Sequence, residues 1–464
     1  MERREGRILK SQFPDVDVPE MSVNDFLEQH SWLNKPQDSI AVIGRSVGPP
    51  DASKEWRLSY RELRESVRRV ASGLARRGLR KGDVVFVCSS NCPEYVITML
   101  AVYSLGAVLT SAIPGSSVNE ILYKLGIAMF CGTLKFFVVS SDELTTARKL
   151  VERCGVNVAR ISFGSIVDKE CIPFNDLLED SGDAFPKDNC VESGDLAVVL
   201  YSSGTTGPPK GIPWAHKILV SHMAMPRFTM REGDVFLLSP LSNVPEVPMS
   251  ALSLGVTSLA LPCFSDPEHY SIAINKYKVT YLFCIPPLIV SLVKKGYELP
   301  TLQRCDAAGS TCSPAVIREA RITHPHLVIT GIYGMNEIGV LINPSSETEQ
   351  SGNKRGVLIG KPVAKSQAKV SPSEMEDILM SHLGVGDVSV TGVPDPENEG
   401  YELIRAFVVR KTDAVSAEDL IEFVKEKTPR KYVTLTGGVR FLRNIPKNQV
   451  GKNMRSELQA QPFE

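Results

Sequence analysis

The feature of this sequence that most restricts its fold is a repeated alternation of extended apolar runs and helical patterns between residues 60 and 332. The extended runs are rich in Val, Ile and Leu, and each is followed by turn residues or a helical pattern. Parallel strands need a crossover, usually a helix, so the alternation predicts a doubly wound α/β fold with largely parallel sheets. The predicted strands are residues 84–88, 107–112, 136–140, 196–201, 256–262, 279–285 and 327–332.

The last quarter of the sequence has a different pattern. Residues 343–369 are rich in Ser, Glu, Gln, Gly and Lys, which is typical of a surface connection. A shorter α+β pattern follows, with helices over 371–382 and 416–427 and strands over 388–393, 406–410 and 439–442. Because 464 residues exceed what one core usually fills, we predict a large multi-sheet α/β domain of residues 1–362, a short connection of residues 363–369 and a small C-terminal domain of residues 370–464.

Charge and cysteine content exclude several classes of protein. The net charge is -1, so the chain has no electrostatic footprint for nucleic acid or for an anionic membrane. The ten cysteines lack the paired short spacings of a zinc site or a compact disulfide framework, which favours a reducing compartment. Cys88 and Cys92 are interpreted as core or loop thiols, with a metal-binding pair as the alternative.

No segment is predicted to cross a membrane. The stretch over 95–113 is uncharged but contains Thr, Ser, Tyr and Gly, so a buried helix followed by a strand explains it better. The amino terminus has no secretory pattern and the carboxyl terminus is not of the Ser-Lys-Leu peroxisomal type, so a cytoplasmic location is expected. The sequence contains no signal for an oligomeric state.

A glycine- and hydroxyl-rich loop follows the predicted strand 196–201. It runs from Tyr201 to Gly211 with the sequence YSSGTTGPPKG. Glycines let the backbone approach phosphates closely, hydroxyls donate hydrogen bonds, and a lysine supplies a mobile positive charge. It is not a Walker A loop, because Pro209 precedes the lysine and no Ser or Thr follows it. An exposed turn is the alternative interpretation. The candidate nucleotide-binding residues are Ser202, Ser203, Gly204, Thr205, Thr206, Gly207 and Lys210.

This loop resembles the signature of the adenylate-forming superfamily, which includes acyl-CoA and coumarate-CoA ligases, luciferases and peptide-synthetase adenylation domains. Those enzymes make an acyl-AMP from a carboxylate and ATP, and then transfer the acyl group to a thiol. The resemblance continues through DAAGS at 306–310, YGMNE at 333–337 and IPKNQVGK at 445–452. It implies ATP and Mg²⁺ at the site, coenzyme A as co-substrate and a small carboxylic acid as partner.

The same resemblance assigns further nucleotide contacts. Tyr333 would stack on adenine beside Gly309 and Gly334, and Glu337 would hold magnesium, although taken alone it has the character of a solvated surface acid. Asn336 replaces the family's usual Thr, and its amide can still donate a hydrogen bond to a phosphate.

Catalysis and substrate binding are assigned in the same way. Lys452, together with Lys210, would neutralise the charge that develops between the carboxylate and the α-phosphate, whereas without its motif it would be a tail lysine. Asn243, Ala308 and Gly309 would line the substrate pocket. Asn243 lies where many ligases have an aromatic-His pair, so the thioester step is expected to be weakened.

One departure from the family lies after residue 362. Relatives have a long stretch there that holds a Thr-Gly-Asp binding both ribose hydroxyls, an Arg contacting the nucleotide, and a hinge. Here residues 363–369 alone occupy that place, and no Thr-Gly-Asp occurs in the sequence. Loss of ribose contacts removes binding energy and loosens positioning.

Three hypotheses follow from these motifs. The first is an ATP-dependent acid-thiol ligase, and the second is a shortened, weakly active or non-catalytic protein that binds nucleotide or acyl group. The third is adenylation without thioester formation. The apolar strand over 282–287 favours an aromatic or medium aliphatic acid in the first and third cases.

Overall fold

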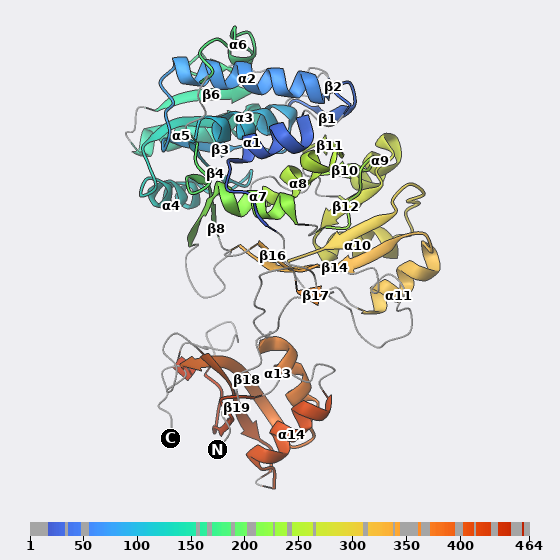
Figure 1. The fold of residues 1–464 in the computed structure, drawn as a ribbon. Coiled ribbons are helices and arrows are strands. Elements are labelled where there is room, and N and C mark those ends of the chain that lie inside the picture. The colour runs from blue at the N-terminus through green and yellow to red at the C-terminus, as the bar shows by residue number, and fades with distance from the viewer. Residues whose placement is uncertain are drawn as a thin grey trace. The chain divides into compact units, whose positions relative to one another are not determined.

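A computed structural model of the chain shows two compact units, Lys10–Ser366 and Gln367–Glu464. Figure 1 follows the elements from the N-terminus in blue to the C-terminus in red. The residues that the structure describes are 17–32, 36–47, 55–154, 158–164, 169–186, 191–201, 210–225, 228–238, 244–262, 266–309, 314–336, 339–343, 361–362, 372–394, 402–412, 414–427, 435–446 and 457–458.

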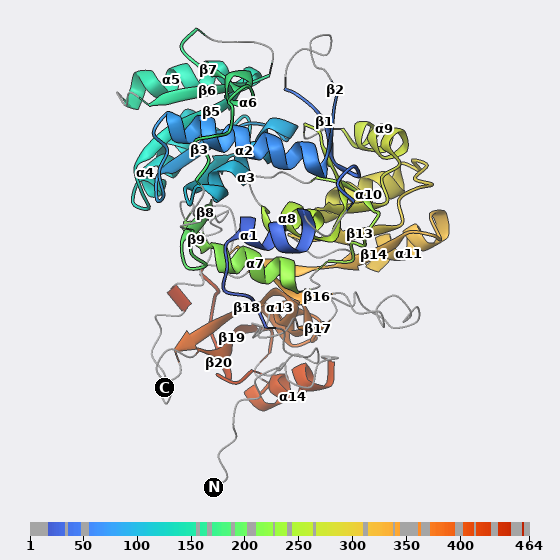
Figure 2. The same cartoon turned by 45° about the horizontal axis from the view of Figure 1, so that its top comes forward.

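Two seven-stranded sheets form the frame of the larger unit (Figures 1 and 2). Neighbouring strands run parallel except at β2 and β9, which pair antiparallel at one edge of each sheet. The first sheet has the order β14 (Val328–Gly331), β13 (Arg304–Ala307), β12 (Tyr281–Cys284), β10 (Val235–Leu237), β11 (Thr257–Ala260), β1 (Ile40–Arg45) and β2 (Glu55–Ser59). The second has the order β7 (Ile172–Pro173), β6 (Ala159–Phe163), β5 (Leu134–Ser140), β3 (Val84–Cys88), β4 (Val108–Ala112), β8 (Leu196–Tyr201) and β9 (Gly211–Ala215).

Helices connect the strands of these two sheets. They are α1 (Val23–Leu27), the short π-helix η1 (Glu28–Trp32), α2 (Tyr60–Arg76), α3 (Pro93–Ser104), α4 (Val118–Ala128), the 3₁₀ turn η2 (Ser141–Glu143), α5 (Leu144–Cys154), α6 (Phe174–Leu178), α7 (His216–Ala224), α8 (Glu246–Leu254), α9 (Pro267–Tyr277), α10 (Pro286–Lys294) and α11 (Pro314–Thr323). The predicted α/β class is therefore confirmed, with sequence-predicted strands recovered as β3, β4, β5, β8, β11, β12 and β14.

Helix α3 occupies the layer between the two sheets. All twelve of its residues are buried, and it contacts β4 of one sheet and β1 of the other. A helix that is apolar on every side needs such surroundings. The uncharged stretch over 95–113 is thus a buried helix followed by a strand, as predicted. Within the described residues, every helix is too short or too polar to span a bilayer.

Strand β3 shows how the sheet packs helices on both faces. Val85 and Val87 belong to the core shared with α2 and α3, whereas Phe86 and Cys88 pack with residues of α4 and α5. Successive side chains of a strand point to opposite faces, so a strand buried on both sides is apolar at every position. This explains the unbroken apolar run at 84–88.

The sequence did not predict several strands: β1, β2, β6, β7, β10 and β13 of the two large sheets, β9, and the strands of a third sheet. Residues 211–215, expected only as the approach to a helix, form β9 and pair antiparallel with β8. An edge strand tolerates Pro213 because one row of its N–H groups has no ladder partner. A third, antiparallel sheet contains β15 (Tyr333–Met335), β16 (Gly339–Asn343) and β17 (Lys361–Pro362).

The smaller unit is a separate α+β fold. Strand β18 (Val385–Pro394) pairs antiparallel with β19 (Glu402–Arg410), which pairs parallel with β20 (Val439–Phe441). Helices α13 (Pro372–Met380) and α14 (Ala417–Lys427) pack on this sheet. Its core includes Met375, Leu379, Val388, Ala406 and Leu420. The elements predicted for this part of the chain are all present.

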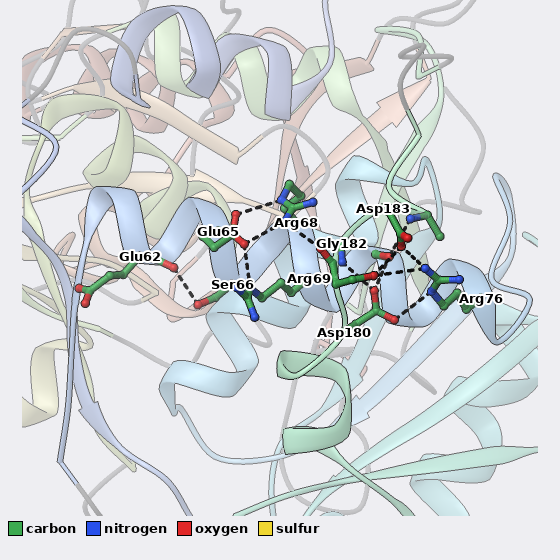
Figure 3. A network of polar contacts seen from close by, with 12 residues as sticks. Glu62, Glu65, Ser66, Arg68, Arg69, Arg76, Asp180, Gly182 and Asp183 are labelled. Carbon is green, nitrogen blue, oxygen red and sulfur yellow. Dashed lines mark hydrogen bonds and ion pairs between the residues drawn. The ribbon is translucent and has the colours of Figure 1, made fainter.

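Arginines and acidic side chains connect α2 to the segment after α6 (Figure 3). Arg68 donates to both carboxylate oxygens of Glu65, each at 2.9 Å, and these hydrogen bonds lower the pKa of Glu65 to about 2. Arg76 pairs with Asp180 at 3.2 Å and with Asp183. Most of these side chains are partly or largely exposed, so each pair contributes only about 0–1 kcal/mol. These ion pairs therefore connect α2 to the segment after α6 but add little to the stability of the fold.

A buried ion pair joins the strands that carry the candidate site. Arg304 in β13 donates to both oxygens of Asp234, next to β10, at 2.5 and 2.7 Å. Both side chains are less than 10% exposed. The hydroxyl of Thr280, next to β12, donates to the same carboxylate at 2.7 Å. Three neighbouring strands are therefore held at one end by one carboxylate.

We expect Asp234→Ala to lower the free energy of unfolding by about 3–5 kcal/mol, because it leaves the Arg304 charge buried without its carboxylate. Urea unfolding followed by circular dichroism measures the loss. The matched control is Asp38→Ala, which removes the exposed partner of Arg61 and should cost about 1 kcal/mol or less. Equal losses of unfolding free energy in the two variants would show that the buried ion pair stabilises the fold no more than the exposed one.

Candidate functional site

A cavity of about 390 Å³ lies at the carboxyl ends of the parallel strands β10, β12 and β13. This edge of an open α/β sheet is where ligands usually bind, and the volume suits a small organic molecule. The walls are largely apolar. They comprise Leu200, Trp214, Leu237, Leu238, Val244, Glu246, Tyr270, Leu282, Phe283, Cys284, Ile285, Leu288, Ala308, Gly309, Ile332, Gly334, Met335, Asn336, Gly339 and Val340.

Asn336 links the end of β8 to the start of the third sheet. Its side-chain amide donates to the backbone carbonyl of Tyr201 at 3.0 Å, and the indole of Trp214 in β9 donates to the Asn336 carbonyl at 2.7 Å. The Tyr201 hydroxyl donates to the Lys124 carbonyl at 2.9 Å and accepts from Thr110 at 2.8 Å. The residue from which the glycine-rich loop departs is therefore anchored on both sides.

A tight contact beside this junction requires a glycine. Gly339 has a φ of +67°, and a Cβ added there would lie 2.2 Å from two ring atoms of His222. The His222 ring stacks on Trp214 with centroids 5.4 Å apart. Only glycine both adopts this backbone conformation readily and leaves room for the ring. The third sheet can thus approach β9 closely and close one side of the cavity.

Asp306 is the centre of a buried network under another wall. Its carboxylate accepts from the Thr229 amide at 2.9 Å, the Thr229 hydroxyl at 2.8 Å and the Tyr281 hydroxyl at 2.7 Å. Burial raises its pKa to about 6, and the hydrogen bonds and Arg304 offset part of that rise. Because β13 ends one residue later, this network positions the turn at Ala308, which lines the cavity.

The structure brings together several residues predicted from the sequence. Ala308, Gly309, Gly334 and Asn336 all line the cavity, and Tyr333 lies half-buried in β15. Lys210 is exposed immediately before β9. The other predicted site residues lie outside the described part of the chain: Ser202, Ser203, Gly204, Thr205, Thr206, Gly207, Asn243, Glu337 and Lys452.

Sequence reasoning missed Trp214, Asp306 and Glu246 as site residues. Trp214 lies in a strand without a recognisable motif, and Asp306 begins the DAAGS motif but was assigned no role, so the contacts of both emerge only from the fold. Glu246 begins α8, where an acid has an ordinary explanation in the helix dipole. The one sequence signal for Glu246 was that this acidic residue stands next to an otherwise apolar segment.

Comparison with protein families agrees with this geometry. The profile described as AMP-binding enzyme matches residues 29–388, and the profile of the AMP-binding enzyme C-terminal domain matches residues 374–452. The chain belongs to the AMP-binding enzyme family. The predicted resemblance to adenylate-forming enzymes is confirmed. The class of chemistry is confirmed with it: an acid is activated with ATP, and its acyl group is transferred to coenzyme A.

Plant ligases are among its relatives. The chain is 25% identical to 4-coumarate–CoA ligase 3 of Arabidopsis thaliana, over 98% of this chain and 94% of the relative. It is 28% identical to 4-coumarate–CoA ligase-like 4 of Oryza sativa subsp. japonica, over 97% and 95%. The first alignment extends over 551 positions whereas the chain has 464 residues, so many positions of that ligase have no counterpart here.

Solved structures share the fold. The luciferase-like enzyme of the mealworm Zophobas morio superposes with a TM-score of 0.67 at 22% identity, covering 86% of this chain and 88% of that one. An anthranilate CoA ligase in complex with anthranoyl-AMP superposes with a TM-score of 0.66 at 18% identity, covering 96% and 98%. At these identities the likeness establishes architecture rather than substrate.

The raised pKa of Asp306 predicts a pH-dependent term in stability. The folded pKa is about 6 and the ordinary value is 3.8, so the folded state binds this proton more tightly than the unfolded state. Asp306 therefore stabilises the folded state most below pH 3.8, and this stabilisation is lost as the pH rises through 6. The loss is roughly 3 kcal/mol.

Asp306→Asn should remove that slope. With its oxygen in the place of Oδ2, the amide can still accept from the Thr229 amide and the Tyr281 hydroxyl, and its NH₂ can donate to the Thr229 hydroxyl oxygen, so the network keeps its shape without a titrating group. The measurement is urea unfolding of both proteins between pH 4 and 7. Parallel stability curves for the two proteins would contradict the assignment.

Proposed function

We propose that this family member is an acid-thiol ligase that converts a carboxylic acid to an acyl-AMP and transfers the acyl group to coenzyme A. The observation that carries the proposal is the contact between Asn336 and Tyr201. It joins the strand that leads into the glycine-rich loop to the segment that leads into Glu337, beside an apolar cavity. An acid in the cavity would have its carboxylate next to the phosphates held by that loop.

Each predicted residue has a separate task in this proposal. The hydroxyl- and glycine-rich loop with Lys210 holds the phosphates, and Tyr333 stacks on adenine. Ala308 and Gly309 shape the acid pocket together with Asn243. Lys452, from the small C-terminal domain, neutralises the charge that develops between the carboxylate and the α-phosphate. Preorganised charge of this kind is a major part of catalysis in charged transition states.

Magnesium fits the same junction. Asn336 is fixed against Tyr201, and Glu337, the residue that follows Asn336 in the sequence, is the proposed magnesium ligand. A carboxylate there can hold Mg²⁺, which when bound screens the negative charge of the phosphates. The two hydrogen bonds that Asn336 makes with Tyr201 and Trp214 support this proposal, because they fix the residue that precedes Glu337 in the sequence.

We expect carboxylate-dependent exchange of pyrophosphate into ATP, in the presence of magnesium, across a panel of aromatic and fatty acids. Lys452→Ala should reduce the exchange by about a hundredfold, because it removes charge stabilisation from the transition state. The control is Lys425→Ala, which alters an exposed lysine of α14. No exchange by the wild type, with ATP still bound, would favour the non-catalytic alternative. Release of pyrophosphate without acyl-CoA would indicate adenylation alone.

The alternative has its own support. We propose that residues 363–369 replace a longer stretch between a large domain of residues 1–362 and a small domain of residues 370–464. The alignment to the Arabidopsis ligase is longer than this chain although it covers nearly all of both proteins, so many aligned positions have no residue of this chain. The two family profiles also overlap over residues 374–388. A gap here would remove the ribose-binding Asp and the hinge, and would slow or abolish turnover.

The missing ribose contacts predict poor discrimination between nucleotides at the ribose. Dideoxy-ATP, which lacks both ribose hydroxyls, should bind within about threefold of ATP. A chain that retained hydrogen bonds from both hydroxyls to a carboxylate would lose more than about tenfold, since such bonds contribute roughly 1.5–3 kcal/mol each. Calorimetry with both nucleotides tests this. A loss above tenfold would show that another acid contacts the ribose.

A further inference from the structure

One residue of the cavity wall differs in kind from all the others. Among the described lining residues, Glu246 is the only charged one, and it is 5% exposed. Its neighbours in the wall include Val244, Leu238 and Leu282. A buried carboxylate in an apolar cavity costs free energy unless donors face it. A buried carboxylate on a cavity wall is an informative departure from the usual exposure of glutamate.

The fold supports a carboxylate at this position. Glu246 is the first residue of α8, whose next six residues, Val247 to Leu252, are buried, so the helix and its end are firmly packed. The partial positive charge of a helix N-terminus stabilises an acid in the first turn. A carboxylate also has about four acceptor positions, so it can accept from a ligand in addition to the contacts that it makes within the protein.

Two other polar side chains of the cavity wall, Trp214 and Asn336, make contacts within the protein. The Trp214 indole donates to the Asn336 carbonyl, and the Asn336 amide donates to Tyr201. Both therefore hold the wall in place. Glu246 is consequently the strongest hydrogen-bond acceptor that the described lining offers to an occupant.

We infer that Glu246 is a specificity-determining residue, which selects acids whose apolar body carries a hydrogen-bond donor such as a hydroxyl or an amine. The inference rests on the proposed function in one respect, that the cavity holds the acid to be activated. A donor on the body of the acid would form a charge-assisted hydrogen bond to the carboxylate in surroundings of low polarity, where such bonds are strongest. A second carboxylate on the acid would be repelled.

The test uses four probes with one frame: phenylpropanoic acid and its para-hydroxy, para-amino and para-carboxy derivatives. Binding to the full chain is measured by calorimetry, which needs no turnover. The hydroxy and amino acids should bind at least about tenfold more tightly than the unsubstituted acid, and the carboxy acid more weakly than all three. This series needs no variant, so it remains decisive even if substitutions prevent folding.

Two variants then assign the preference to the side chain. Glu246→Leu removes every acceptor and should abolish the preference for donors, whereas Glu246→Gln keeps one acceptor without the charge and should retain about half of it in free energy. The matched control is Glu268→Gln, because Glu268 is also a first-turn acid, of α9, but lies outside the cavity lining. It should leave the order of binding unchanged.

Several results would overturn the inference. They are equal binding of the donor-bearing and plain acids by the wild type, no binding of any probe, or an unchanged order in Glu246→Leu. Pyrophosphate exchange with the same acids is measured separately. If the binding order holds but no acid supports exchange, the ligase proposal fails while the selectivity of the pocket stands. If exchange occurs without the binding order, the ligase proposal stands and the role of Glu246 is rejected.

Discussion

The hydrogen bond from the Asn336 amide to the Tyr201 carbonyl is the contact on which the candidate site depends. Its two residues are far apart in the sequence, and each is followed directly by a motif that the resemblance assigns to nucleotide. This hydrogen bond can set the geometry of the site because each of its two residues is also held by other hydrogen bonds. Tyr201 is held through its hydroxyl by two further hydrogen bonds, and the Asn336 carbonyl is held by Trp214. The geometry of the loop entrance is therefore set by the scaffold.

The apolar cavity follows from the same scaffold. Parallel strands β10, β12 and β13 end together, the Asp234–Arg304 pair holds their other ends, and Asp306 fixes the last turn before Ala308. Asp234, Arg304 and Asp306 are each buried together with specific partners. The cavity wall carries one further buried carboxylate among its described residues, Glu246, which is the side chain that we propose selects the acid.

Much of the architecture could be predicted from the sequence, because strands buried on both faces leave unbroken apolar runs such as 84–88 and 196–201. Strand β9 could not, since its pairing depends on how the chain returns after the loop and Pro213 argues locally against a strand. The motif residues Gly309 and Asn336 were found through resemblance. The acid at 246 was not, because local sequence cannot separate a helix-starting glutamate from one that faces a cavity.

The proposed position of the shortened connection also explains how two hypotheses about activity can coexist. Every described residue of the acid cavity and of the phosphate-loop anchor precedes residue 341, and their contacts are made among themselves. A gap after residue 362 therefore leaves those contacts intact and acts on ribose binding and on the hinge. Under the proposed function, binding of the acid and of phosphate depends on one part of the chain, and turnover depends in addition on Lys452 in another. Loss of the connection would then lower the rate of catalysis far more than it lowers affinity for the acid.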